Sequence, residues 1–547
     1  MHILEKHKLI LCILLLSCVG GFFRFYNLNW DNGHFFHPDE RNIANAVSRI
    51  KFFSQLNPGF FAYGGFLIYL YRATGDILNL LTHNTTWTYD WGHINIIGRF
   101  YSALFSTITI PLIFILSKNI FNKYTAVIAS LLTTFCVSFI QTSHFSITEN
   151  FLILMSILIC LLSTKLLKKI KLKDYILCGV FLGIAIATKT TALSFAIFPF
   201  AAYILTIAEL PHNFLKRTKL LISLVSASFL TFTIFSPYTF LQWDKFIESM
   251  RYESGVALGT LPVPYTLQFA NTPPYIFQVK NLLWQMGPIS YLLIPSIVLF
   301  ILIIIKTKNP KFILFISFPL IYFLYVGNWH TKFIRFILPT IPFFIILISY
   351  FLYIVQSRLK LVGKTLTLIS ISFTIFWALA FFSIYTKEQT RIIASKWIYQ
   401  NIPTNSKLLG EHWDDGLPIA IETFYPSKYN IKQLTIYEPD VNEKINYYAD
   451  ELSNADYIII NSRRLYGTLI NLPQKYPITS RYYKLLFDGK LGYKKAAEFS
   501  SYPSIFGFEI NDDTSEETFQ VYDHPKIMVF KNTNRLDKKI IVNLLSL

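Results

Sequence analysis

Long apolar runs separated by short polar segments fill the first 387 residues of the chain. A helix that crosses a bilayer needs about 17–25 mostly apolar residues. Eleven runs reach that length, which predicts an α-helical polytopic membrane protein with about 11 transmembrane helices. They lie near residues 8–28, 95–117, 124–143, 149–166, 174–190, 191–208, 219–237, 288–305, 311–327, 334–355 and 364–385.

Two apolar segments are less regular. The first run follows a short charged stretch, as in a signal peptide, but no small-x-small cleavage site follows it, so we expect an uncleaved first helix. The segment 58–82 is rich in glycine and is interrupted by Arg72 and Asp76. It predicts an interfacial or re-entrant helix, with a twelfth span as the alternative.

The pattern changes near residue 387, where short apolar runs begin to alternate with amphipathic ones. Strands are predicted at 406–411, 432–437, 456–462 and 518–530, and helices at 441–455 and around 464–490. This alternation is typical of a small α/β domain. We therefore expect a transmembrane domain over 1–386, with interfacial helices in its first outer loop, and an extracytoplasmic α/β domain over 387–547.

Composition and charge support this division and set the orientation. The chain is 53% hydrophobic and only 15% charged, which is too apolar for an ordinary soluble protein. Residues 1–387 hold 31 of the 50 Lys and Arg but 12 of the 32 Asp and Glu. The bases cluster in alternate loops, so the positive-inside rule predicts a multi-pass plasma-membrane protein with a cytoplasmic N-terminus and gives no reason to invoke nucleic acid. All five cysteines lie within or beside apolar runs, which leaves no disulfide framework.

The stretch WDNGHFFHPDE, residues 30–40, follows the first predicted span on the expected outer face. Pro38 and two acids suit the first turn of a helix, and an acid close to hydrocarbon is costly enough to favour a functional role. Successive helical residues point about 100° apart. We therefore expect Asp39 and Glu40 to have different roles. One carboxylate would face the reacting groups, and the other would pair with a base.

Other charged residues fall on the same predicted face. His144 and Glu149 lie in the turn QTSHFSITEN, where the alternative role of Glu149 is that of an acid in the first turn of a helix. Lys189 interrupts an apolar run at its outer end, where it either binds an anion or extends to the interface. Bases that hold a lipid-linked phosphate, together with a carboxylate acting as general base, suit group transfer from a phospholipid carrier. Three further bases have comparable outer positions: Arg99, Lys332 and Arg335.

Several motifs together resemble the GT-C glycosyltransferases, in particular the bacterial and archaeal branch of protein O-mannosyltransferases and aminoarabinose transferases. Their order and spacing along nearly the whole chain carry the resemblance. The motifs are WDNGHFFHPDE, GRFYSALFSTITIPL, QTSHFSITENFLI, GIAIATKTTAL, PYTLQFANTPPYIFQVKNLLWQMGP, KFIRFILPTIPFF, ASKWIYQNIPTNSKLLGEHWDDGLPIA and VYDHPKIMVF.

The resemblance implies a polyprenyl-phosphate sugar as donor, inversion at the anomeric carbon, and a glycan, lipid or protein acceptor. Its catalytic acid matches Asp39 and Glu40, of which we favour Asp39. Glu149 stands where the family commonly has Asp, so its carboxylate reaches one methylene further. The remaining roles implied are acceptor contacts for Glu149, His144 and Glu253; phosphate contacts for Arg99, Lys189, Lys332 and Arg335; and, if the loops bring them together, a divalent metal on Asp31, His37 and Asp39.

Two alternatives remain open from the sequence. A lipid or sugar transporter also places charges among spans, but it predicts charges at mid-membrane and two related halves, and the chain shows no internal repeat. The loop EHWDDGLP in the tail either contacts sugar or acceptor, or is a turn at the end of a strand.

Overall fold

A computed structural model describes residues 2–168, 170–209 and 211–546. The chain forms two compact units. The membrane unit comprises 1–29, 33–261 and 273–382, and the sheet unit comprises 30–32, 262–272 and 383–547.

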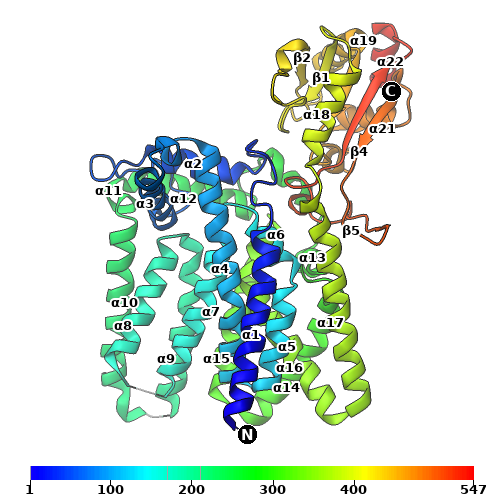
Figure 1. The fold of residues 1–547 in the computed structure, drawn as a ribbon. Helices are drawn as coiled ribbons and strands as arrows, with labels where there is room; N and C mark the ends of the chain where they lie inside the picture. The colour runs from blue at the N-terminus through cyan, green and yellow to red at the C-terminus, as the bar shows by residue number, and fades with distance from the viewer. Residues whose placement is uncertain (1, 169, 210, 547) are drawn as a thin grey trace. The chain divides into compact units, whose positions relative to one another are not determined.

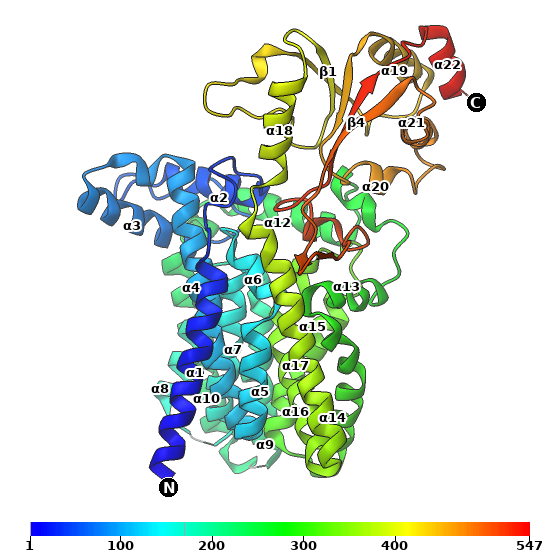
Figure 2. The same cartoon turned by 45° about the vertical axis from the view of Figure 1, so that its right-hand side comes forward.

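Every predicted span coincides with a helix of the membrane unit, and the long helices run side by side (Figures 1 and 2). Among the described residues, eight helices are long and apolar enough to cross a membrane, or nine if a bent pair counts as one span. α8 and α15 are shorter. The predicted multi-pass, mostly helical fold is confirmed. The helices of its bundle are α1 (His2–Phe25), α4 (Trp91–Ile120), α5 (Lys123–Thr134), α6 (Val137–Ser143), α7 (Glu149–Leu166), α8 (Leu172–Ile186), α9 (Ile197–Glu209), α10 (Phe214–Phe235), α14 (Leu293–Thr307), α15 (Pro310–Val326), α16 (Ile341–Arg358) and α17 (Lys360–Phe382).

The bent pair is α5 and α6, which meet at 48°. The break frees backbone carbonyls, and a buried arginine of α1 binds two of them. The Arg24 guanidinium donates to the carbonyls of Thr133 at 2.9 Å and Thr134 at 3.0 Å, and its Nε donates to Ser106 Oγ at 2.8 Å. Because a charged group inside a span needs polar partners, the break and the arginine stabilise each other.

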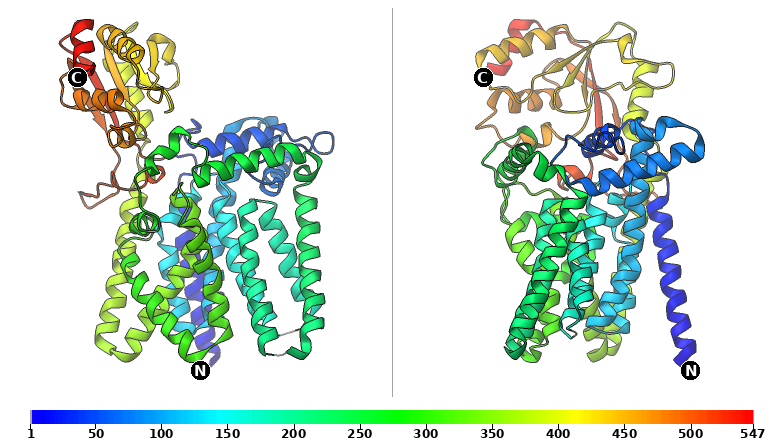
Figure 3. Two further views of the ribbon diagram at one scale, coloured as in Figure 1. Left: turned by 180° about the vertical axis from the view of Figure 1, so that it is seen from behind. Right: turned by 90° about the vertical axis from the view of Figure 1, so that its left-hand side faces the viewer.

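A second set of helices lies at the end of the bundle away from the N-terminus, which we call the site end (Figures 1 and 3). It includes α2 (Pro38–Arg49), α3 (Gly65–Thr82) and α12 (Trp243–Leu258), and further on α11 (Tyr238–Leu241) and α13 (Ile276–Met286). α3 is the helix predicted within 58–82. It is not among the helices that meet the criteria for a span, in keeping with the interfacial interpretation.

The start of α3 docks onto the end of α8 through its backbone. The Gly64 N–H donates to the Thr188 carbonyl at 2.9 Å, and the Phe66 N–H donates to the Ala187 carbonyl at 3.0 Å. A Cβ at Gly64 would lie 2.0 Å from the Ala187 oxygen, so only glycine permits this approach. The docking fixes the residue before it, Tyr63, beside the segment that follows α8.

The sheet unit holds a five-stranded sheet in the order β2-β1-β3-β7-β4. β1 pairs in parallel with β2 and β3, and β7 runs antiparallel to β3 and β4. The predicted α/β fold is confirmed. Its elements are β1 (Lys407–Glu411), β2 (Asn430–Leu434), β3 (Tyr457–Ile460), β4 (Tyr493–Phe499) and β7 (Ile527–Asn532), with α18 (Thr390–Asn401), α19 (Asn442–Asn454), α20 (Tyr466–Leu469), α21 (Pro477–Phe487) and α22 (Lys538–Ser546).

Alternate residues of the sheet face two cores. Leu409 and Ile458 pack in the cluster formed with α19 and α21, whereas Leu408 and Ile459 pack in the cluster formed with α18. The strand expected over 518–530 begins only at Ile527, because 517–519 form a short 3₁₀ turn. Four elements were not anticipated, namely α18, β4, α22 and a hairpin of β5 (Ser504–Ile505) and β6 (Phe508–Glu509).

A fully buried histidine stabilises the turn before β7. His524 Nε2 lies 2.7 Å from Asp512 Oδ2, and its Nδ1 lies 2.5 Å from Asp523 Oδ1. Burial acts to lower its pKa, but Asp523 and Asp512 outweigh burial and raise the pKa to about 10. The imidazolium therefore holds two carboxylates in the interior of the unit at neutral pH.

Because the folded-state pKa of His524 exceeds its usual value of about 6.5, its stabilisation is complete below that value and is lost as pH rises toward 10. We expect the melting temperature of the sheet unit to fall between pH 7 and 9.5. The slope from one proton is at most about 1.4 kcal/mol per pH unit. Scanning fluorimetry of the wild type and His524→Gln tests this, since the variant should be less stable at pH 7 and less sensitive to pH. Equal pH dependence of the two proteins would contradict the assignment.

Candidate active site

The site begins at the first turn of α2. His37 is the N-cap, and its Nδ1 accepts a hydrogen bond from the Asp39 N–H at 3.2 Å. Burial lowers the pKa of His37 to about 4, so this nitrogen stays an acceptor at neutral pH. The next two residues of the helix point to different surroundings: Glu40 is fully buried, whereas the side chain of Asp39 keeps 16% exposure.

Glu40 forms a buried ion pair with Arg99 of α4. Arg99 Nε donates to Oε1 at 2.8 Å and Nη2 donates to Oε2 at 2.6 Å, while the Ser146 N–H also donates to Oε1 at 2.6 Å. Arg99 further donates to the Leu28 carbonyl at 2.8 Å. The pair links α2, α4 and the turn before α7. This geometry differs from the expected roles of Glu40 in catalysis and Arg99 in phosphate binding, because each side chain is buried against the other.

Asp39 forms an ion pair with Arg335, whose side chain is 23% exposed. The Tyr63 hydroxyl donates a second hydrogen bond to the Asp39 carboxylate. Burial acts to raise the pKa of Asp39, but Arg335, His37 and Lys189 together bring it below its usual value. Asp39 is therefore ionised and partly accessible, which are the properties a general base needs before it meets its substrate.

A second ion pair lies beside the first. Lys189 Nζ lies 3.0 Å from Glu149 Oε1, and the lysine sits 5.0 Å from the centre of the Tyr63 ring. Tyr63 therefore contacts both pairs, with its hydroxyl on Asp39 and its ring against Lys189. Glu253 of α12 adds a third acid to this group, since its carboxylate interacts electrostatically with Lys189, Arg335 and Asp39.

Two predicted residues have other surroundings. His144 is buried, with Nδ1 2.8 Å from the Ile140 carbonyl and Nε2 2.9 Å from the Tyr26 carbonyl. Both ring nitrogens therefore contact the backbone of the protein, and neither faces a site for an acceptor substrate. Lys332 donates to the His330 carbonyl at 2.9 Å, and burial lowers its pKa. We therefore leave both outside the reacting group.

The expected metal ligands do not form a metal site. In the described part of the chain, no three His, Cys, Asp or Glu side chains are close enough to hold an ion. The His37 Nδ1 accepts a hydrogen bond from the Asp39 N–H. The residues present do not fit a divalent cation at Asp31, His37 and Asp39.

Tyr63 is the site residue that sequence reasoning missed. In a chain with 33 tyrosines and 17% aromatic residues, one more tyrosine carries no signal. The adjacent Gly64 and Gly65 were the available clue, because paired glycines before a helix indicate a close backbone approach.

Comparisons with known proteins agree with this fold. Residues 92–240 match the family model described as dolichyl-phosphate-mannose-protein mannosyltransferase. A search of curated protein sequences gives no match. Among solved structures, the chain is similar to the oligosaccharyltransferase AglB of the archaeon Archaeoglobus fulgidus in complex with an inhibitory peptide and a dolichol-phosphate. That match has a TM-score of 0.53 and 13% identity, and covers 93% of this chain and 75% of AglB.

Two further structures are similar. AglB tethered to an acceptor peptide with an NVT sequon matches with a TM-score of 0.53 and 14% identity over 93% of this chain and 76% of AglB. ArnT from Cupriavidus metallidurans bound to undecaprenyl phosphate matches with a TM-score of 0.45 and 10% identity over 96% of this chain and 98% of ArnT. The family model and the AglB fold confirm the predicted resemblance to the GT-C glycosyltransferases.

The buried pair makes a direct prediction. Arg99→Met leaves the Glu40 carboxylate buried without its cation, which typically costs about 3–5 kcal/mol. Arg72→Met is the matched control, because its partner Asp76 is 36% exposed and such pairs contribute about 0–1 kcal/mol. Thermal unfolding of the detergent-solubilised proteins should show a large loss for Arg99→Met alone, with partial recovery in Glu40→Gln/Arg99→Met. Equal losses at Arg99 and Arg72 would refute the structural role of the pair.

Proposed function

We propose that the protein is a membrane glycosyltransferase that transfers a sugar from a polyprenyl-phosphate carrier to an acceptor hydroxyl. The observation that carries this proposal is the accessible Asp39 carboxylate, paired with Arg335 and adjacent to Lys189 at the site end of the bundle. The family match, whose description specifies a dolichyl-phosphate mannose donor, supports a lipid-linked sugar. The dolichol-phosphate bound to AglB supports the same class of carrier.

In the proposed reaction Asp39 acts as general base. The acceptor oxygen attacks the anomeric carbon while its proton passes to the Asp39 carboxylate. The bond from that carbon to the phosphate oxygen breaks, its electron pair stays on the oxygen, and polyprenyl phosphate leaves. Attack from the face opposite the leaving group inverts the anomeric configuration.

Arg335 links donor binding to activation of the base. Without donor, its guanidinium neutralises Asp39 and lowers the pKa of that carboxyl. A phosphate that binds Arg335 through charge-assisted hydrogen bonds withdraws this cation from Asp39. The pKa of Asp39 then returns toward its usual value, and the carboxylate becomes a stronger base only when donor is in place. Lys189 can leave Glu149 and bind the same phosphate. Glu149 and Glu253 then lie toward the acceptor.

The positive-inside pattern supports an extracytoplasmic site. The lysine clusters follow α7, α14 and α16 on the side of the bundle where the N-terminus lies, whereas the site is at the other end (Figure 1). The proposal therefore has a cytoplasmic N-terminus, a catalytic membrane domain over 1–386 and an extracytoplasmic domain over 387–547. Acceptors are molecules on that side of the membrane, and the acceptor peptide tethered to the Archaeoglobus fulgidus oligosaccharyltransferase supports a protein among them.

Asp39→Asn tests the base. It keeps the size of the side chain but removes the proton acceptor, so transfer should fall by about 10²–10⁴-fold. The assay measures labelled sugar passing from polyprenyl-phosphate donors to membrane acceptors, with Asp76→Asn on α3 as the control that keeps full rate. Wild-type rates in Asp39→Asn would remove Asp39 from catalysis. If the wild type transfers sugar from no donor and instead moves labelled carrier across vesicles, the protein is a transporter.

Tyr63→Phe tests the link between the two ion pairs. It keeps the ring beside Lys189 but removes the hydrogen bond that lowers the pKa of Asp39. The acidic limb of the pH–rate profile should therefore move to higher pH, by about one unit if the bond contributes about 1.5 kcal/mol. Tyr69→Phe is the control, since its hydroxyl donates to the Leu56 carbonyl away from Asp39. An unchanged acidic limb would show that Tyr63 acts on packing alone.

A further inference from the structure

The sheet unit carries a short hairpin that no part of the proposed reaction uses. β5 and β6 pair antiparallel, with Ser504 opposite Glu509 and Ile505 opposite Phe508. Phe506 and Gly507 form the two-residue turn between them, and both have positive φ, 51° and 83°. This is the requirement of a type I′ turn, for which Asn-Gly is the favoured pair.

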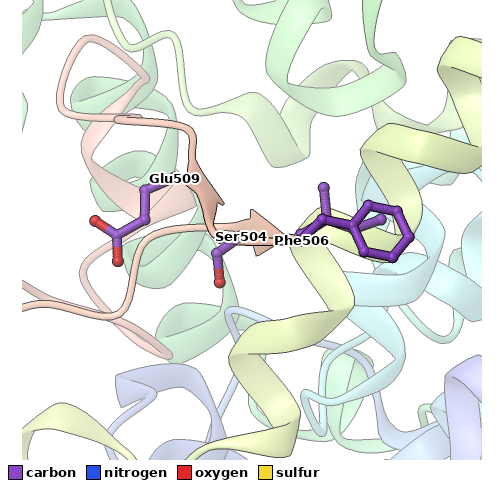
Figure 4. A pocket seen from close by; sticks show the side chains of 5 residues that line it. Ser504, Phe506 and Glu509 are labelled. Atoms are coloured by element: carbon purple, nitrogen blue, oxygen red, sulfur yellow. The ribbon is translucent and has the colours of Figure 1, made fainter.

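A phenylalanine is therefore held where the backbone disfavours it. Bulky residues rarely adopt positive φ, and such an outlier indicates a role for the side chain. Phe506 is 88% exposed and Phe508 is 71% exposed. Five residues of the hairpin line a shallow pocket, Ser504, Ile505, Phe506, Gly507 and Glu509, and in Figure 4 the Phe506 ring lies at the end of the hairpin away from Glu509. The tip thus presents two aromatic rings to its surroundings.

The base of the hairpin is tied to the residues that follow the last membrane helix. The Ser504 N–H donates to Ser383 Oγ at 3.1 Å, and Lys387 Nζ donates to Ser504 Oγ at 2.9 Å. Ser383 is bonded directly to Phe382, the last residue of α17. Lys387 is the first charged residue after that apolar run. This attachment therefore holds Ser504 next to the residues that directly follow α17, the last apolar run of the chain.

We infer that the β5–β6 hairpin is a membrane-interface anchor whose partner is the lipid surface, into which Phe506 and Phe508 insert. Phenylalanine is one of the side chains that interfacial segments bury at the boundary between headgroups and acyl chains, and lysine extends its charge from that boundary to water. A two-residue tip offers little area for a protein partner, which needs roughly 800 Å² per side. The inference is independent of the proposed reaction, because it concerns only the sheet unit and its attachment.

The test is power-saturation EPR on the full chain in lipid nanodiscs. A nitroxide is placed at Phe506→Cys in a Cys12→Ala/Cys18→Ala background, since the other three cysteines are buried. The control label is at Phe424→Cys, whose native ring stacks on Tyr399 with 5.3 Å between centroids. Tyr399 is 16 residues beyond Ser383, which corresponds to roughly 20 Å of mostly helical chain.

The label at 506 should be relaxed more by oxygen than by the water-soluble nickel reagent, and the label at 424 should show the reverse. A second label, at Glu509→Cys, should lose its oxygen preference in Phe506→Asn/Phe508→Thr, which restores the favoured Asn-Gly turn while removing both rings. A 506 label relaxed mainly by nickel would show that the tip lies in water. A label shielded from both reagents would show that it lies against protein. Either result overturns the inference, and neither affects the glycosyltransferase assay.

Discussion

The site end of the membrane unit depends on the buried ion pair between Glu40 and Arg99. A carboxylate at this depth is tolerated only with a cation and further hydrogen bonds, which Arg99 and the Ser146 N–H supply. The pair connects the first turn of α2 to α4 and to the turn before α7. Because α2 is short, fixing Glu40 also fixes the direction of its neighbour, and this places Asp39 against Arg335.

The other charged side chains of the site are also held in pairs of opposite sign, which lowers the cost of placing them near hydrocarbon. Asp39 is balanced by Arg335, and Glu149 is balanced by Lys189. Tyr63 joins the two pairs, and its position follows from the backbone docking at Gly64. A bundle of apolar helices thus maintains a small, nearly neutral set of charges that a ligand can rearrange without removing any of them from protein contact.

Much of this arrangement could be predicted from the sequence. The eleven apolar runs located every long helix. The HPDE turn indicated Asp39 and Glu40, which the structure places in ion pairs at the site end, because carboxylates are rare in this half of the chain. The separate duties of Asp39 and Glu40 followed from the angle between successive helical residues. The sequence did not show which acid has which role, because that depends on the ion pair of Glu40 with Arg99, 59 positions away in the sequence. Tyr63 and the hairpin were missed for another reason: they depend on backbone approach and positive φ, which leave little trace in a hydrophobicity pattern.

The two bases at the site, Arg335 and Lys189, have a kinetic consequence for the proposed reaction. A polyprenyl-phosphate sugar is a diester with one negative charge, whereas the departing polyprenyl phosphate is a monoester that carries close to two at neutral pH. A site that offers Arg335 and Lys189 to the phosphate therefore attracts the product more strongly than the donor. In the proposed reaction, the same cations that bring the carrier into position are therefore expected to slow the departure of the spent lipid.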